Sequence, residues 1–136
     1  MQATINKGSC LCGRVRYEVD GELAAPHLCH CSRCRKAHGS AFTAAVAVKT
    51  KDFRIVAGED TLGDYAHEGV HRWFCRNCGS PLFATRDAML NMMRLRIAAL
   101  DTPYDKKPVA HIYATSKAHW YDILDGAPQY EQRPLY

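Results

Sequence analysis

Three cysteines lie within six residues in the segment from Cys29 to Cys34, which reads Cys-His-Cys-Ser-Arg-Cys. Their spacing, C-x-C-x-x-C, lets three sulfurs converge on one point when an ion holds them there. In a chain kept in a reducing compartment, such a cluster is usually a metal site. Three protein ligands leave one coordination position open, which is the pattern of a catalytic metal.

The other four cysteines form two close pairs, Cys10-x-Cys12 and Cys75-x-x-Cys78. Their four sulfurs match a closed structural zinc site, which would tie the start of the chain to its middle. Disulfides explain the cysteines less well, because seven is an odd number and a C-x-C pair can hardly bond internally without strain. We call the two groups the four-sulfur set (Cys10, Cys12, Cys75 and Cys78) and the three-sulfur set (Cys29, Cys31 and Cys34). Two zinc ions per chain are expected, with partial occupancy allowed at the three-sulfur set.

Three thiolates limit the chemistry that the three-sulfur set can support. Zinc bound to them carries a net negative charge, so it is a weaker Lewis acid than zinc on three histidines and lowers the pKa of bound water less. This argues against hydrolysis by an activated water. A thiol ligand suits such a soft site, so the expected substrate is a thiol.

Nearby histidines and basic residues leave alternatives open. His27, His30 or His38 could supply a fourth ligand and close a second structural site. His30 could instead carry a proton or have a structural role only. Three basic side chains are candidate contacts for the carboxylates of an anionic substrate: Arg33, Arg35 and Lys36. The alternative for these three is a solvated helix face that offsets the charge of the thiolates.

Length and composition indicate one globular domain. The chain has 136 residues, of which 47% are hydrophobic and 24% are charged. No window approaches the ~20 apolar residues of a bilayer span, and the N-terminus lacks an apolar signal segment, so we expect a cytoplasmic protein with no membrane partner. The formal charge of +4 is mostly offset once the cysteines are zinc-bound thiolates, which disfavours nucleic-acid binding.

Alternation of apolar and polar residues predicts a mainly β fold. Strands are predicted over residues 14–19, 42–48, 53–57, 72–74, 82–85, 93–97 and 109–114, with a polar hairpin connection at 49–52. One short helix is predicted over about residues 33–38, with Ser32 as its N-cap and Gly39 just after its end. We expect the domain to cover residues 6–124 and a surface tail to cover 125–136.

Five stretches of the chain form a recognisable pattern. Three contain cysteines: Gly-Ser-Cys-Leu-Cys-Gly-Arg-Val-Arg-Tyr from Gly8, His-Cys-Ser-Arg-Cys-Arg-Lys-Ala-His-Gly-Ser-Ala-Phe from His30, and Phe-Cys-Arg-Asn-Cys-Gly-Ser-Pro-Leu-Phe from Phe74. Two follow later: Ala-Leu-Asp-Thr-Pro from Ala99 and His-Ile-Tyr-Ala-Thr-Ser-Lys-Ala-His-Trp from His111. Over about residues 6–130 the chain resembles the glutathione-dependent formaldehyde-activating enzyme (GFA) family, which includes centromere protein V.

The resemblance implies a fold, two metal sites and an activity. The implied fold is a mainly β, Mss4-like arrangement of zinc-stapled antiparallel sheets with one short helix after the three-cysteine motif. The implied metals are a structural zinc on the four-sulfur set and a second zinc on the three-sulfur set that meets the sulfur of glutathione. The founding activity of the family joins glutathione to formaldehyde as S-hydroxymethylglutathione and is classed as a carbon-sulfur lyase.

We therefore expect a zinc-dependent carbon-sulfur lyase whose catalytic residues are Cys29, Cys31 and Cys34. The thiolate of a glutathione-like substrate would add to a small aldehyde such as formaldehyde, or leave from the adduct in reverse. The main alternative is a non-catalytic, zinc-stabilised binding or scaffold module. A thiol redox protein that uses one of the C-x-x-C pairs is the remaining class.

Overall fold

The structure is a computed structural model that describes residues 4–133. The chain divides into two compact units, each assembled from separate stretches of sequence. The described part of the first unit comprises residues 4–24 and 46–105, and that of the second comprises 25–45 and 106–133. Each sulfur set lies entirely within one unit, the four-sulfur set in the first and the three-sulfur set in the second.

The first unit is built from antiparallel strands. One sheet has the order β1-β2-β5, and four further strands pair in the order β9-β8-β7-β6. The strands are β1 (Ile5–Ser9), β2 (Arg16–Asp20), β5 (Phe53–Ala57), β6 (Leu62–His67), β7 (Val70–Cys75), β8 (Pro81–Arg86) and β9 (Met89–Arg96). Three short 3-10 helices complete this unit: η1 (Thr50–Asp52), η2 (Glu59–Thr61) and η3 (Ile97–Ala99).

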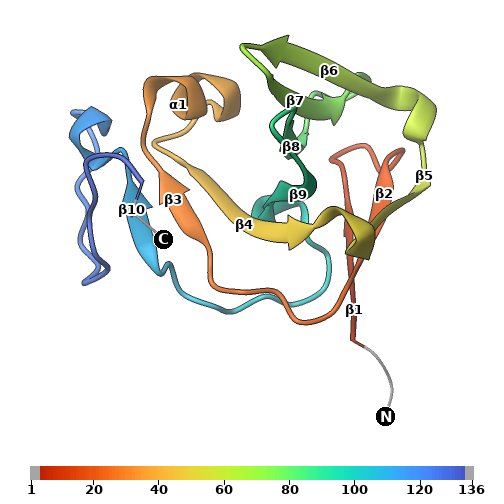
Figure 1. Ribbon diagram of the computed structural model, residues 1–136, viewed down its shortest axis with the longest axis horizontal. Helices are drawn as coiled ribbons and strands as arrows, with labels where there is room; N and C mark the ends of the chain where they lie inside the picture. The colour runs from red at the N-terminus through yellow and green to blue at the C-terminus, as the bar shows by residue number, and fades with distance from the viewer. Residues whose placement is uncertain (1–3, 134–136) are drawn as a thin grey trace. The chain divides into compact units, whose positions relative to one another are not determined.

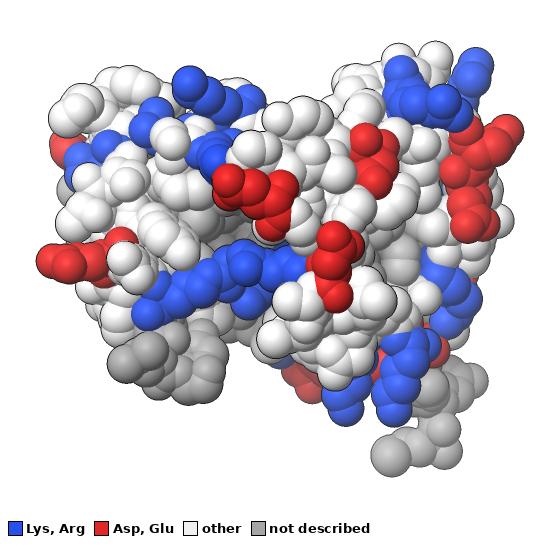
Figure 2. Space-filling model, turned by 45° about the horizontal axis from the view of Figure 1, so that its top comes forward, with Lys and Arg blue, Asp and Glu red and all other residues white. Residues whose placement is uncertain are grey.

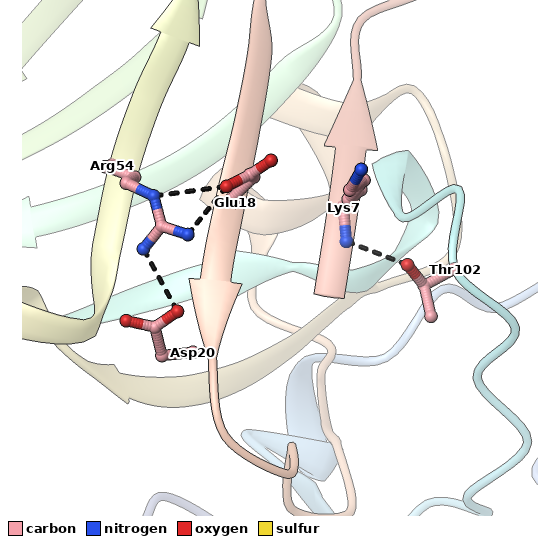
Figure 3. Close-up of polar contacts among 5 residues, drawn as sticks. All are labelled: Lys7, Glu18, Asp20, Arg54 and Thr102. Carbon is pink, nitrogen blue, oxygen red and sulfur yellow. Dashed lines mark hydrogen bonds and ion pairs between the residues drawn. The ribbon is translucent and has the colours of Figure 1, made fainter. Parts of the chain in front are cut away.

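Side-chain alternation in β2 determines which face of its sheet is buried. Tyr17 and Val19 are each 1% exposed, because alternate side chains of a strand point to the same face. On β5, Arg54 lies opposite Glu18, and its guanidinium bonds Glu18 at 2.6 Å and Asp20 at 3.0 Å (Figure 3). These ion pairs match the register of the two strands.

The core of the first unit draws side chains from both groups of strands. Leu82 and Leu95 are fully buried, and the ring of Phe53 packs against two other aromatic rings. Cys10 and Cys75 belong to the same buried cluster. The four-sulfur set is therefore anchored in the core by two of its members.

The second unit carries a parallel strand pair and the one α-helix found in residues 4–133. β3 (His27–Cys29) pairs in parallel with β10 (Ala110–Ile112) and antiparallel with the first residues of β4 (Thr43–Lys49) (Figure 1). β4 continues into the first unit at Val46. The helix α1 (Ser32–His38) follows β3, and η4 (Ala114–Ser116) follows β10. No helix in the described chain is long and apolar enough to cross a bilayer.

The predicted mainly β fold with one helix is confirmed, and three details differ. The hairpin at 49–52 is wrong, because β5 pairs with β2 and η1 fills the connection. The helix begins at Ser32, inside the three-cysteine motif, because Cys31 rather than Ser32 is its N-cap. Gly39 ends the helix in the left-handed conformation, with φ 58°, as expected. Among the named strands of residues 4–133, the pairing of β3 with β10 is parallel, whereas antiparallel sheets were predicted.

The domain limits at residues 6–124 and the tail at 125–136 stay a prediction. Most side chains between 125 and 133 are exposed, yet this segment is bonded to β10. The N–H of Tyr130 donates to the carbonyl of His111 at 2.9 Å, and the N–H of His111 donates to the carbonyl of Pro128 at 2.8 Å. The last three residues of the predicted tail lie outside the described residues.

Candidate metal centres

Two tight turns bring the four-sulfur set together. Cys10 and Cys12 lie between β1 and β2, whereas Cys75 ends β7 and Cys78 precedes β8. All four sulfurs lie within 4.8 Å of one another. The sulfurs of Cys10 and Cys12 are 3.6 Å apart and those of Cys12 and Cys75 are 3.8 Å apart, near the ~3.8 Å edge of a sulfur tetrahedron around zinc. The donors therefore fit one zinc ion.

A glycine closes each of the two turns. The N–H of Gly13 donates to the carbonyl of Cys10 at 3.0 Å, and the N–H of Gly79 donates to that of Cys75 at 2.7 Å. Both glycines have positive φ, 80° and 83°, a conformation that a side chain would strain. The Cys-Gly sequences at 12–13 and 78–79 thus reflect the backbone that the set requires.

The cysteines of the four-sulfur set differ in acidity because their surroundings differ. Burial raises the pKa of Cys75 to about 11. A hydrogen bond with the hydroxyl of Ser80, 3.2 Å away, lowers the pKa of Cys78 to about 5. The side chain of Asn77 lowers the pKa of Cys12. Two sulfurs of the set are therefore favoured as thiolates, the form that binds metal.

The three-sulfur set lies at the junction of β3 and α1. Cys29 is the last residue of β3, Cys31 is the N-cap of α1, and Cys34 lies in the first turn of the helix, 8% exposed. The sulfur of Cys31 accepts a hydrogen bond from the N–H of Cys34 at 3.3 Å. All three sulfurs lie within 4.8 Å of one another, so this single segment offers three converging ligands.

Crowding of these sulfurs makes a cation favourable. Hydrogen bonds with the thiols of Cys31 and Cys34, together with burial, raise the pKa of Cys29 above its ordinary value. A divalent ion among the sulfurs would reverse this effect, because it attracts each thiolate. Among the described residues no histidine, aspartate or glutamate joins the set, so closure by a nearby histidine is not found. The donors fit a zinc ion with a fourth position left for another ligand.

A buried pair of histidines adjoins the three-sulfur set. His30, between two of the cysteines, and His111 of β10 are both 0% exposed. Nε2 of His30 lies 2.8 Å from Nδ1 of His111, whose Nε2 lies 2.9 and 3.0 Å from the carboxylate oxygens of Asp125. Burial and the nearby His111 lower the pKa of His30, and the hydrogen bond with His111 lowers the pKa of Asp125.

Sequence reasoning considered His30 but missed its two partners. His111 stands inside the apolar run 109–114, which marks it as an unusual strand residue. Only the parallel pairing of β10 with β3 brings it to His30, and only the bonding of the 125–130 segment to β10 brings Asp125 to His111. Neither contact has a signature in sequence spacing.

The three predicted substrate contacts lie on α1 but differ in their surroundings. Arg33 and Lys36 are exposed and lie three residues apart, hence on one side of the helix. Arg35 is half-buried, and its Nε donates to the carbonyl of His30 at 3.4 Å, which supports the cysteine segment. Figure 2 shows Lys and Arg side chains in several local groups on the face that it draws.

Comparison with known proteins identifies a family and several similar proteins. The model of the family described as "Glutathione-dependent formaldehyde-activating enzyme" matches residues 5–116. A protein of Halomonas elongata named "Putative glutathione-dependent formaldehyde-activating enzyme" is 29% identical over 86% of this chain and 80% of its own length. A protein of the same name from Aspergillus flavus is 28% identical over 83% of this chain and 54% of its own length.

One solved structure extends the comparison to the fold. A crystal structure of a Rhodobacter sphaeroides protein has a TM-score of 0.62 and 30% sequence identity to this chain. The match covers 75% of this chain and 97% of that protein. The chain thus spans about half the length of the Aspergillus relative and most of the length of the bacterial proteins.

Proposed function

Because the chain belongs to the glutathione-dependent formaldehyde-activating enzyme family, we propose that it is a zinc-dependent carbon-sulfur lyase acting on a glutathione-type thiol and a small aldehyde such as formaldehyde. The observation that supports this is the three-sulfur set, whose sulfurs lie within 4.8 Å of one another with no other side-chain ligand among residues 4–133. A soft, incomplete ligand set leaves room for a fourth sulfur supplied by a substrate.

The proposal divides the work between the two sulfur sets. The four-sulfur set would hold a zinc ion that stabilises the first unit, and the three-sulfur set would hold the ion that substrate meets. A zinc ion at the latter set favours the thiolate form of a bound thiol. Arg33 and Lys36, exposed on one side of α1, would receive the carboxylates of glutathione, and Arg35 would support the cysteine segment.

The proposed reaction forms or breaks one carbon-sulfur bond. The thiol sulfur bonds to the carbonyl carbon of the aldehyde, and the carbon-oxygen double bond becomes single. The proton lost by the thiol ends on the new hydroxyl, so the S-hydroxymethyl adduct forms with no oxidant or reductant. In reverse, the carbon-sulfur bond breaks and thiol and aldehyde are released.

Location and fold family form part of the same proposal. All seven cysteines are thiols rather than disulfides, which favours a reducing compartment such as the cytoplasm. The Mss4-like assignment is supported by the two sulfur sets held within a mainly β chain. A domain over residues 6–124 would contain both sets.

Exchange NMR spectroscopy tests the activity directly. Glutathione, formaldehyde and their adduct interconvert without a catalyst, so the rate of exchange would be measured with and without protein of known zinc content. We expect faster exchange with the two-zinc protein and no acceleration with Cys31→Ser. Equal rates with and without the two-zinc protein would contradict the proposal and favour a zinc-stabilised binding module.

A further inference from the structure

Three side chains connect an exposed carboxylate to the three-sulfur set, and the proposed reaction gives them no role. The side chain of Asp125 is 43% exposed, whereas His111 and His30 are fully buried. Distances of 2.9 Å from Asp125 to His111 and 2.8 Å from His111 to His30 make a continuous hydrogen-bonded string. The N–H of Ala127 also donates to Asp125, at 3.1 Å, and holds the carboxylate in place.

The carboxylate sets the direction of its own hydrogen bonds with His111. An ionised Asp125 only accepts, so Nε2 of His111 carries a proton and donates it. Nδ1 of His111 and Nε2 of His30, 2.8 Å apart, share one proton between the two rings. The ring of His30 is buried and also contacts the backbone of Ala41. The contacts on both sides of His111 therefore hold the two rings in one arrangement.

His30 also couples the string to the backbone that carries two of the sulfurs. It is the residue between Cys29 and Cys31. Its N–H donates to the carbonyl of Ile112 at 3.0 Å, and its carbonyl accepts from Arg35 at 3.4 Å. With the ring held as well, the peptide groups on both sides of His30 have little freedom to turn, so both sulfurs keep their direction.

We propose that Asp125 and His111 are positioning residues for the three-sulfur set, which act through His30 to keep Cys29 and Cys31 directed at one ion. The proposal rests on the proposed zinc at this set. A prealigned set binds an ion without first having to order its ligands, so the string raises metal affinity. Removing a side chain that orients metal ligands typically weakens metal binding about 10-fold to 100-fold.

Competition with a chelator measures this effect at each set separately. Protein loaded with Co²⁺ would be titrated with a chelator, and sulfur-to-cobalt absorption bands would report each ion. The bands lost in Cys31→Ser identify the three-sulfur set. The variants are Asp125→Ala, Asp125→Asn, which keeps an oxygen acceptor, and the control Asp64→Ala, which removes a 2.7 Å hydrogen bond to His71 in the first unit.

Asp125→Ala is expected to weaken ion binding at the three-sulfur set about 10-fold or more and to alter the absorption bands of that ion. The affinity of the four-sulfur set for its ion should change by no more than about 2-fold. Asp125→Asn should lose less ion affinity at the three-sulfur set than Asp125→Ala does. Asp64→Ala should leave the ion affinity of both sets unchanged. Unchanged affinity and bands at the three-sulfur set in Asp125→Ala would overturn the proposal, and so would an equal loss at both sets. Uptake of only one ion by the unaltered protein would instead contradict the proposed zinc at this set, and the positioning role with it.

Discussion

The two sulfur sets differ in how much chain separates their ligands. The four-sulfur set joins Cys12 to Cys75, 63 positions apart, whereas the three-sulfur set lies within one six-residue segment. Closing a long loop costs the unfolded chain more entropy than closing a short one, so holding it closed contributes more to folding. Ligand number and loop length together therefore fit the two proposed roles, with the four-sulfur set maintaining the fold and the three-sulfur set binding a substrate.

The sets also differ in what supports them. Cys10 and Cys75 are buried among apolar side chains of the first unit, and glycine turns shape the backbone around them. The three-sulfur set has a polar support in the second unit, the string from Asp125 to His30. Four predictions test this contrast, from the largest expected effect to the smallest.

Removing a ligand from the four-sulfur set should cost the most stability. Cys75→Ser takes one sulfur from the proposed structural ion, and such ions contribute on the order of 10 kcal/mol to small zinc domains. We expect the free energy of unfolding to fall by several kcal/mol and zinc content to fall by one ion or more. Urea unfolding followed by circular dichroism, with zinc measured on the same sample, checks this. An unfolding midpoint equal to that of the unaltered protein would contradict the structural role proposed for the four-sulfur set.

Removing a ligand from the three-sulfur set should cost activity rather than stability. Cys31→Ser is expected to lose one zinc ion and to lower the rate of adduct exchange by about 100-fold or more, because the thiol is no longer activated. The melting temperature should move by no more than a few degrees. The neighbouring exposed Ser32 offers a matched control in Ser32→Ala. Full activity in Cys31→Ser, or a melting temperature as low as that of Cys75→Ser, would break the contrast between the sets.

Charge reversal on α1 should weaken substrate binding with a smaller effect on turnover. Replacing both Arg33 and Lys36 by Glu is expected to raise KM for glutathione about 10-fold, because two charge-assisted contacts to carboxylates are lost. Zinc content should remain at two ions. Lys51→Glu, an exposed charge reversal in the first unit, is the control. If the control raises KM as much as the double variant does, α1 is not the site that receives the carboxylates.

His71, a histidine that lies between two carboxylates, should affect only the pH dependence of stability. His71 bonds Asp64 at 2.7 Å and Asp87 at 2.8 Å, and these hydrogen bonds raise the pKa of His71. Since the folded pKa exceeds the unfolded value of ~6.5, the stabilisation is complete below that value and is lost as pH rises through the folded pKa. Melting temperatures measured from about pH 6 to mildly alkaline pH should show this decline, and His71→Gln should flatten it without loss of either ion. An identical pH profile in the variant would show that the hydrogen bonds of His71 to the two carboxylates do not contribute to stability.

The sequence was informative where the cause of structure is local. Val15, Tyr17 and Val19 alternate with polar residues and are buried as expected, because the period of a strand is visible in any short window. The grouping of the cysteines followed from counting and close spacing, and both groups converge. Gly39 ended the helix as its conformational freedom predicts.

Features that depend on distant segments could not be predicted. β5 follows β4 after a turn-like sequence but pairs with β2, since strand pairing depends on the faces that the core buries. β6 escaped prediction because its exposed residues Asp64, Tyr65 and Ala66 are consecutive and show no alternation. The N-cap of α1 is a cysteine, a role that cap preferences assign to Ser32 instead.

Cadmium NMR spectroscopy tests the central claim, that the three-sulfur set holds an ion with a position open to a thiol. Protein loaded with ¹¹³Cd should give two resonances, one of which is absent from Cys31→Ser. On addition of glutathione we expect that resonance alone to move, because a fourth sulfur then joins its ion while the four-sulfur set is already complete. Two resonances that both stay in place, or movement of the resonance that Cys31→Ser retains, would contradict the account.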